Sequence, residues 1–76
     1  MEQTPVTDGS AIAGRTLAEA RIPQQTGLIV IALGKHTDTG LDFVFNPSAD
    51  TRIETGDDVI VLGDTAQMER LRAYVS

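Results

Sequence analysis

The stretch ETGDDVIVLGD, from Glu54 to Asp64, sets four carboxylates around a short apolar run. Within it, Val59–Leu62 is apolar throughout and rich in β-branched residues, which is typical of a buried β-strand. Gly56-Asp57 precedes this run and Gly63-Asp64 follows it, and both pairs are typical of turns. The stretch therefore predicts one buried strand between two turns.

The same acids also suggest a divalent-metal site, which would need Glu54, Asp57, Asp58 and Asp64 to converge. An EF-hand loop achieves this by placing its oxygen ligands at alternate positions, with a glycine at the sixth. Here a strand about 15 Å long would hold Asp58 and Asp64 apart. We therefore expect no metal site within one chain: Asp57 or Asp58 forms the turn, Asp64 caps a helix and Glu54 is solvated. The alternative is that Asp57 and Asp58 meet acids of a second subunit.

Two capping boxes predict where helices begin. Asp64 with Gln67 starts a C-terminal helix, in which Met68, Leu71 and Val75 would lie on one face against a sheet. The stretch Thr16–Glu19 starts a short helix, and we expect Pro23 to end it, because a proline disfavours helical backbone in the residue before it.

The other strands are predicted in the first half of the chain. Leu28–Leu33 is apolar at six successive positions, which indicates a strand buried on both faces. The loop Gly34–Gly40 predicts a long hairpin connection to a strand at Leu41–Phe45, which Asn46-Pro47 ends. A domain this small rarely covers both faces of a strand by itself, so we expect a homodimer.

These elements predict the α+β class in two layers: a small, mainly antiparallel sheet of three to four strands, one short helix and one longer C-terminal helix. Residues 1–9 are polar and contain a proline and a glycine. We expect them to be a linker or an added start, with a short strand from Val6 as the alternative. The domain itself is expected to occupy residues 10–76.

Composition excludes several classes of function. The chain has 76 residues, enough for one domain, and no cysteine that could form a disulfide or a thiolate zinc site. Its net charge is -5 and its six basic residues are scattered, which argues against binding to nucleic acid or to anionic membranes. The apolar run Leu28–Leu33 is far shorter than the roughly 20 residues that a membrane-spanning helix needs.

Catalytic machinery is hard to assemble from these residues. The only histidine, His36, lies in the predicted hairpin loop, and neither a GxGxxG nor a P-loop motif is present. The sequence neighbours of His36 are Thr37 and Asp38, and neighbours at a loop tip lack the scaffold that a catalytic triad requires. A small hydrolase using His36, Asp57 and Asp58 is the competing hypothesis. We predict that the chain is not an enzyme and contains no catalytic residue.

Read in order, the segments resemble the TrkA-C domain, also called RCK-C. The matching segments span Ser10 to Val75: Gly14–Leu17, Glu19–Arg21, Gly27–Ile31, Asn46-Pro47, Asp50–Ile53, Gly56-Asp57, Val59–Gly63, Met68 and Leu71. Each motif alone is weakly specific, and it is their order and spacing that carry the resemblance.

The resemblance implies a non-catalytic, cytoplasmic, dimeric domain that senses a small nucleotide or an ion and regulates a potassium channel or potassium uptake. Its partners would be a second copy, a preceding Rossmann-like nucleotide-binding domain and a membrane pore or transporter at the inner face of the membrane. It would hold no cofactor of its own. The alternatives are the same module on another ion or anion transporter or antiporter, and a purely structural dimerisation domain.

The resemblance also suggests binding residues. Some family members bind cyclic di-AMP through an acid-x-Arg pair on the short helix, together with a proline and a histidine after the second strand. Glu19 and Arg21 match the pair, and Pro47, preceded by Asn46, matches the proline. Ala49 stands where the histidine would fall, so the set is incomplete. Glu19 also has a structural explanation as the acid of the capping box.

Overall fold

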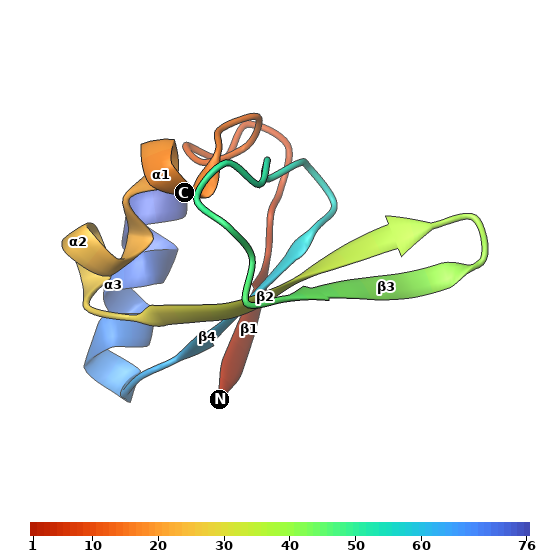
Figure 1. Cartoon of the computed structure of the whole chain (residues 1–76). Coiled ribbons are helices and arrows are strands. Elements are labelled where there is room, and N and C mark those ends of the chain that lie inside the picture. The colour runs from red at the N-terminus through yellow and green to blue at the C-terminus, as the bar shows by residue number, and fades with distance from the viewer.

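The computed structural model describes residues 1–76 and contains seven elements. They are β1 (Glu2–Pro5), α1 (Leu17–Ala20), α2 (Ile22–Thr26), β2 (Ile29–Thr37), β3 (Gly40–Phe45), β4 (Asp58–Leu62) and α3 (Thr65–Val75). The strands form one antiparallel sheet in the order β1-β4-β2-β3. The helices gather beside one part of the sheet, and the β2–β3 hairpin extends away from them (Figure 1). The predicted α+β class is confirmed.

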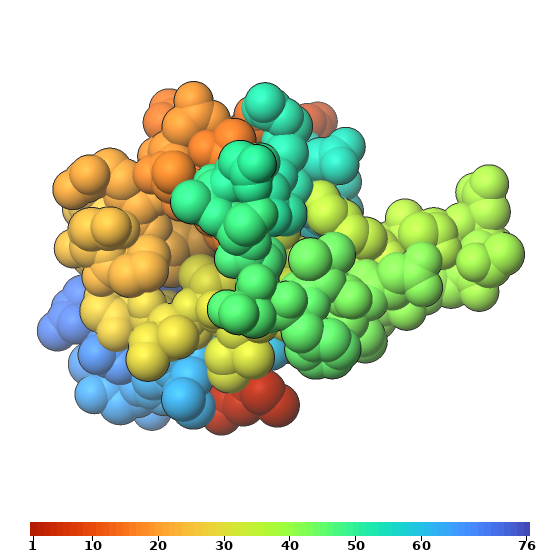
Figure 2. Space-filling model, in the orientation of Figure 1, coloured from red at the N-terminus to blue at the C-terminus, as the bar shows by residue number.

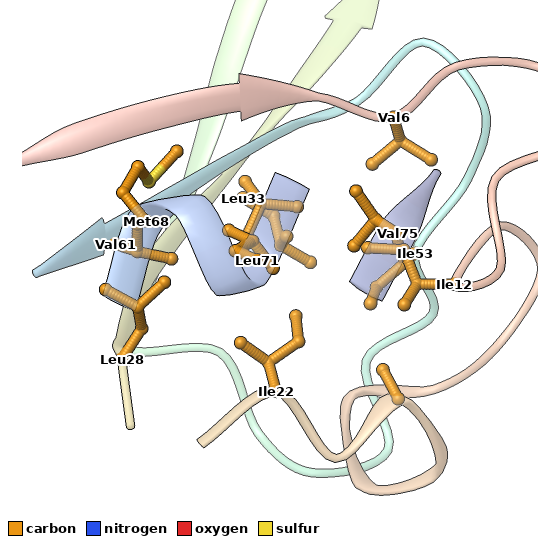
Figure 3. Close-up of a cluster of buried hydrophobic side chains, with 12 residues drawn as sticks. Val6, Ile12, Ile22, Leu28, Leu33, Ile53, Val61, Met68, Leu71 and Val75 are labelled. Atoms are coloured by element: carbon orange, nitrogen blue, oxygen red, sulfur yellow. The ribbon is translucent and has the colours of Figure 1, made fainter. Parts of the chain in front are cut away.

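The core lies between the sheet and α3. Leu33 and Leu71 meet at its centre, with Leu28, Val61 and Met68 toward one end and Val6, Ile12, Ile53 and Val75 toward the other (Figure 3). Val59 and Val61 of β4 are fully buried, as their position in an inner strand predicts. Removing these side chains from water supplies most of the driving force for folding.

The turn between β4 and α3 follows the sequence prediction. The Gln67 backbone N–H donates to Asp64 Oδ1 at 2.8 Å, and the Asp64 N–H donates to Gln67 Oε1 at 2.8 Å, which completes the capping box. Gly63 leaves room for its neighbours here, because a Cβ at this position would overlap the ends of the Leu28 and Gln67 side chains unless they shifted. The chain therefore passes close to Leu28, the residue before β2, as it enters α3.

The predictions for the chain start and the short helix differ from the structure. Residues 1–9, predicted to be a linker, instead supply β1, which pairs with β4 at Glu2–Pro5. An edge strand tolerates Pro5 because one side of it forms no ladder. Pro23 does not end the short helix. Helix α1 already ends at Ala20, because the next residue, Arg21, has a left-handed backbone conformation (φ 52°). Pro23 lies in the first turn of a second helix, α2. Proline suits that turn because its missing N–H would have no helical partner there.

Two strand predictions also need correction. The predicted loop Gly34–Gly40 is mostly strand, since β2 runs to Thr37 and only Asp38 and Thr39 form the turn. The apolar run of β2 is covered on one face only: Ile29 remains 61% exposed, and a bulge interrupts the pairing between Val30 and Ala32. None of the three helices is long and apolar enough to cross a membrane.

The core makes a direct prediction. Leu71→Ala removes a fully buried side chain from the centre of the cluster, and we expect it to lower the free energy of unfolding by about 2–5 kcal/mol. Urea denaturation followed by circular dichroism measures this loss. Arg72→Ala changes the exposed neighbouring position and serves as the control, with an expected effect within about 0.5 kcal/mol. Equal losses for the two variants would contradict the assignment of Leu71 to the core.

Candidate functional site

An open groove of about 350 Å³ lies between the two short helices, the start of β2 and the segment after β3. Its lining residues are mainly apolar: Leu17, Ala18, Ile22, Pro23, Gln24, Ile29, Val30, Pro47 and Ala49. This volume is at the lower end of the range for small-molecule sites. Figure 2 shows α1 and the 46–51 segment lying side by side on this surface.

Backbone hydrogen bonds hold the two walls of the groove together. The first N–H groups of a helix have no partner within the helix, and here loop carbonyls accept from them. Leu17 N–H donates to Thr51 O at 3.0 Å, and Ala18 N–H donates to Ala49 O at 2.9 Å. At the other end of the segment, Asn46 N–H donates to Ile31 O at 2.8 Å. The 46–51 segment is thus attached to both α1 and β2, which makes it a fixed wall.

The four predicted binding residues occupy different places. Pro47 lines the groove, and Asn46 precedes it, exposed and in a left-handed conformation (φ 46°). Arg21 is exposed in the turn between α1 and α2. The Glu19 carboxylate accepts from the Thr16 N–H at 2.9 Å, as the capping box predicts. The structure therefore brings only Pro47 of the four into the groove itself.

Two guanidinium groups lie close enough to Glu19 of α1 to affect its titration. Hydrogen bonds from Thr16 are the main reason that the pKa of Glu19 is held below its ordinary value, and the guanidinium groups of Arg52 and Arg15 lower it further. Arg52 also donates to Gly14 O at 2.5 Å, which keeps it beside the start of α1. An apolar groove on a domain that also carries guanidinium groups near α1 suits a ligand that has both a flat apolar part and an anionic part.

The apolar groove residues of α1 and α2 were not identified from the sequence. Leu17, Ala18 and Ile22 resemble ordinary helix residues, and nothing in their spacing indicates a ligand. The second helix, α2, was itself missed. Because α2 forms one wall of the groove, the groove could not be predicted without it.

The four acids of the opening stretch do not converge on one site, although Glu54, at 3.4 Å, and Asp57 both pair with Lys35 Nζ. Asp57 is buried and accepts from Lys35 Nζ at 2.5 Å and from the Glu54 N–H at 2.8 Å. Asp58 lies 3.2 Å from His36 Nε2, and Asp64 caps α3. No group of three or more His, Cys, Asp or Glu side chains comes together that could hold a metal ion. The predicted turn and cap roles are confirmed, whereas the ion pair of Asp57 with Lys35 was not foreseen.

The fold and the groove define a small α+β domain with a ligand-sized recess beside α1 and α2. A sequence model of the TrkA-C domain matches residues 1–76, and the chain belongs to this family. TrkA-C domains are regulatory, not catalytic, and have no cofactor of their own.

Two curated proteins contain similar segments. The chain is 34% identical over 71 residues to the K(+)/H(+) antiporter subunit KhtT of Bacillus subtilis, and 33% identical over 66 residues to an uncharacterised transporter of Rhodopirellula baltica. These alignments cover 93% and 87% of this chain, but only 41% and 11% of those proteins. The chain thus corresponds to one part of each relative.

Solved structures show the same fold. The RCK_C domain dimer of S. agalactiae BusR in complex with c-di-AMP has a TM-score of 0.82 at 25% identity, covering 96% of this chain and 85% of that one. The GsuK channel bound to NAD has a TM-score of 0.79 at 25% identity, and the match covers 96% of this chain and 13% of the channel. BusR has also been solved with promoter DNA, where the match covers 34% of the BusR chain.

The environment of Glu19 predicts its titration. Because its folded pKa is lowered from the ordinary 4.5, the capping box should stabilise the fold above the unfolded pKa and lose this contribution as the pH falls through the folded pKa. Carboxyl chemical shifts measured by NMR should give Glu19 a pKa below 4.5. Thr16→Ala removes the hydroxyl and should bring the pKa part of the way back. An ordinary or raised pKa in the unmodified chain would contradict this assignment.

Proposed function

We propose that this chain is a ligand-sensing, homodimeric regulatory domain on the cytoplasmic side of a membrane ion-transport system. The observation that carries the proposal is the groove between α1, α2 and the 46–51 segment, which has mainly apolar walls, with the guanidinium groups of Arg15 and Arg52 near Glu19 of α1. A similar domain in BusR has been solved as a dimer with c-di-AMP.

We propose an adenine nucleotide as the ligand, with cyclic di-AMP as the first compound to test. Both c-di-AMP in BusR and NAD in GsuK contain adenine and phosphate. In this chain, adenine would lie against Pro47 and the apolar walls, and phosphate would lie near Arg15, Arg21 and Arg52. Asn46 would offer its side-chain amide beside Pro47, and Glu19 would keep α1 in place. Because the net charge is -5, a local group of arginines is needed to attract an anion.

The proposed host is a potassium channel or transporter, a choice supported by the similarity to KhtT. A preceding Rossmann-like domain and a membrane pore or transporter complete the proposed assembly. A ligand held between two copies would favour one arrangement of the dimer over another. It could bias the transport protein only by the difference in its affinity for the two arrangements, typically about 1–3 kcal/mol. Nucleic acid is not part of the proposal, because acidic residues outnumber basic ones by 11 to 6.

Ligand binding can be tested by calorimetric titration of the chain with cyclic di-AMP, and in parallel with NAD. Ala18→Glu puts a bulky carboxylate into the groove, and we expect it to weaken binding at least about tenfold through steric exclusion and charge repulsion. Ala73→Glu makes the same change at an exposed position of α3 and should leave the affinity unchanged. Equal weakening by both variants, or no binding of either compound to the unmodified chain, would refute the proposed site.

A gain-of-function variant gives a second test. Ala49 occupies the position of the histidine that some cyclic di-AMP-binding members carry, and it lines the groove. Ala49→His adds a hydrogen-bonding group at this wall, so we expect tighter binding of cyclic di-AMP by several-fold in the same titration. Weaker binding by this variant would argue that the ligand lies differently in this chain.

A further inference from the structure

Helix α3 carries a row of polar groups beside its buried face. The buried residues of the helix point into the core (Figure 3), and each of them directly follows a residue with a hydrogen-bonding side chain: Gln67, Arg70 and Tyr74. Spacings of three and four residues place side chains on the same side of a helix. These three residues therefore form a row along α3, which we call the polar row.

The polar row donates to carbonyl groups at the ends of the two short helices. The last carbonyl oxygens of a helix have no donor within the helix and need one from elsewhere. At the end of α1, Ala20 O accepts from Tyr74 Oη at 2.5 Å. At the end of α2, Thr26 O accepts from Arg70 Nη1 at 3.3 Å. Side chains of α3 thus hold both short helices by their C-terminal ends.

Gln67 extends the same contact to the residue after α2. Its side-chain oxygen belongs to the capping box with Asp64, and its Nε2 donates to Gly27 O at 3.3 Å. The two segments approach closely here, because a Cβ on Gly27 would lie 2.8 Å from Gln67 Nε2. The side chain that starts α3 therefore also fixes the chain where it leaves α2.

The two short helices lie between the polar row and the groove. They pack beside α3 (Figure 1), and they also provide groove-lining residues, among them Leu17, Ala18 and Ile22. Arg21 joins the two helices in a left-handed conformation (φ 52°), which is unfavourable for a residue other than glycine. Local preference therefore does not keep α1 and α2 in their relative positions, and contacts with other elements must do so.

We propose that Gln67, Arg70 and Tyr74 are positioning residues that set the shape of the groove, and with it the affinity for ligand, from behind the groove wall. None of the three lines the groove itself. A wall that is already held in its binding position need not be ordered when the ligand binds, so less free energy is lost on binding. The effect on affinity rests on the proposed ligand-binding function, whereas the placement of the wall can be measured without a ligand.

Tyr74→Phe tests the inference, because it removes the hydroxyl and keeps the ring that packs against the core. Hydrogen exchange followed by NMR without ligand should show the amides of Ala20 and Gly27 exchanging about three- to tenfold faster relative to those of β4. A general loss of stability would instead accelerate both groups of amides alike. In calorimetric titration, cyclic di-AMP should bind about three- to tenfold more weakly to this variant.

Two arginines of α3 provide a matched pair of variants. Arg70→Ala removes the donor to Thr26 O, whereas Arg72→Ala removes the same charge from an exposed position outside the polar row. We expect faster relative exchange at Gly27 and weaker binding of cyclic di-AMP for Arg70→Ala only.

Unchanged relative exchange in Tyr74→Phe would overturn the inference, and so would equal effects of Arg70→Ala and Arg72→Ala. Faster exchange with an unchanged affinity for cyclic di-AMP would also contradict it, because the wall would then move without consequence for binding. If the unmodified chain binds neither cyclic di-AMP nor NAD, the proposed function fails and the effect on affinity fails with it. The exchange rates then still decide whether the polar row holds the groove wall.

Discussion

A sheet has two faces, and a chain of 76 residues can cover only one of them with helices. Here α3 and α2 cover the face that carries Val59, Val61 and Leu33, and these side chains form the buried core. The opposite face keeps Phe43, Phe45 and Ile29 exposed. The chain has too few residues to cover both faces of its sheet. One face is therefore buried under helices, and the other is left exposed and suited to a partner.

The contacts that hold the short helices also frame the groove. An isolated helix of four or five residues has little stability of its own, so α1 and α2 depend on tertiary contacts. Tyr74 of α3 donates to Ala20 O at 2.5 Å, and the 46–51 segment accepts from the first N–H groups of α1. The groove is therefore built by contacts between residues that are far apart in the sequence.

Local signals in the sequence predicted the elements whose chemistry is complete within a few residues. The strand at Val59–Leu62, the cap at Asp64 and the box at Thr16–Glu19 are confirmed, because turn formation and capping need only near neighbours. The predictions failed where pairing with a residue far away in the sequence decides whether a strand forms and where it ends. β1 exists because β4 offers it an open edge, and β2 extends to Thr37 because β3 pairs along its whole length.

The sequence by itself therefore determined the α+β class, the helix starts, the separate roles of the four acids and the resemblance to TrkA-C domains. Only the tertiary structure decided that the acid at position 57 is buried against Lys35 and that Pro47 faces a groove closed by α2. It also decided that Leu41, Phe43 and Phe45 share a face with Ile29. Periodicity shows which residues of one strand point the same way, but the choice of face depends on which elements pack there.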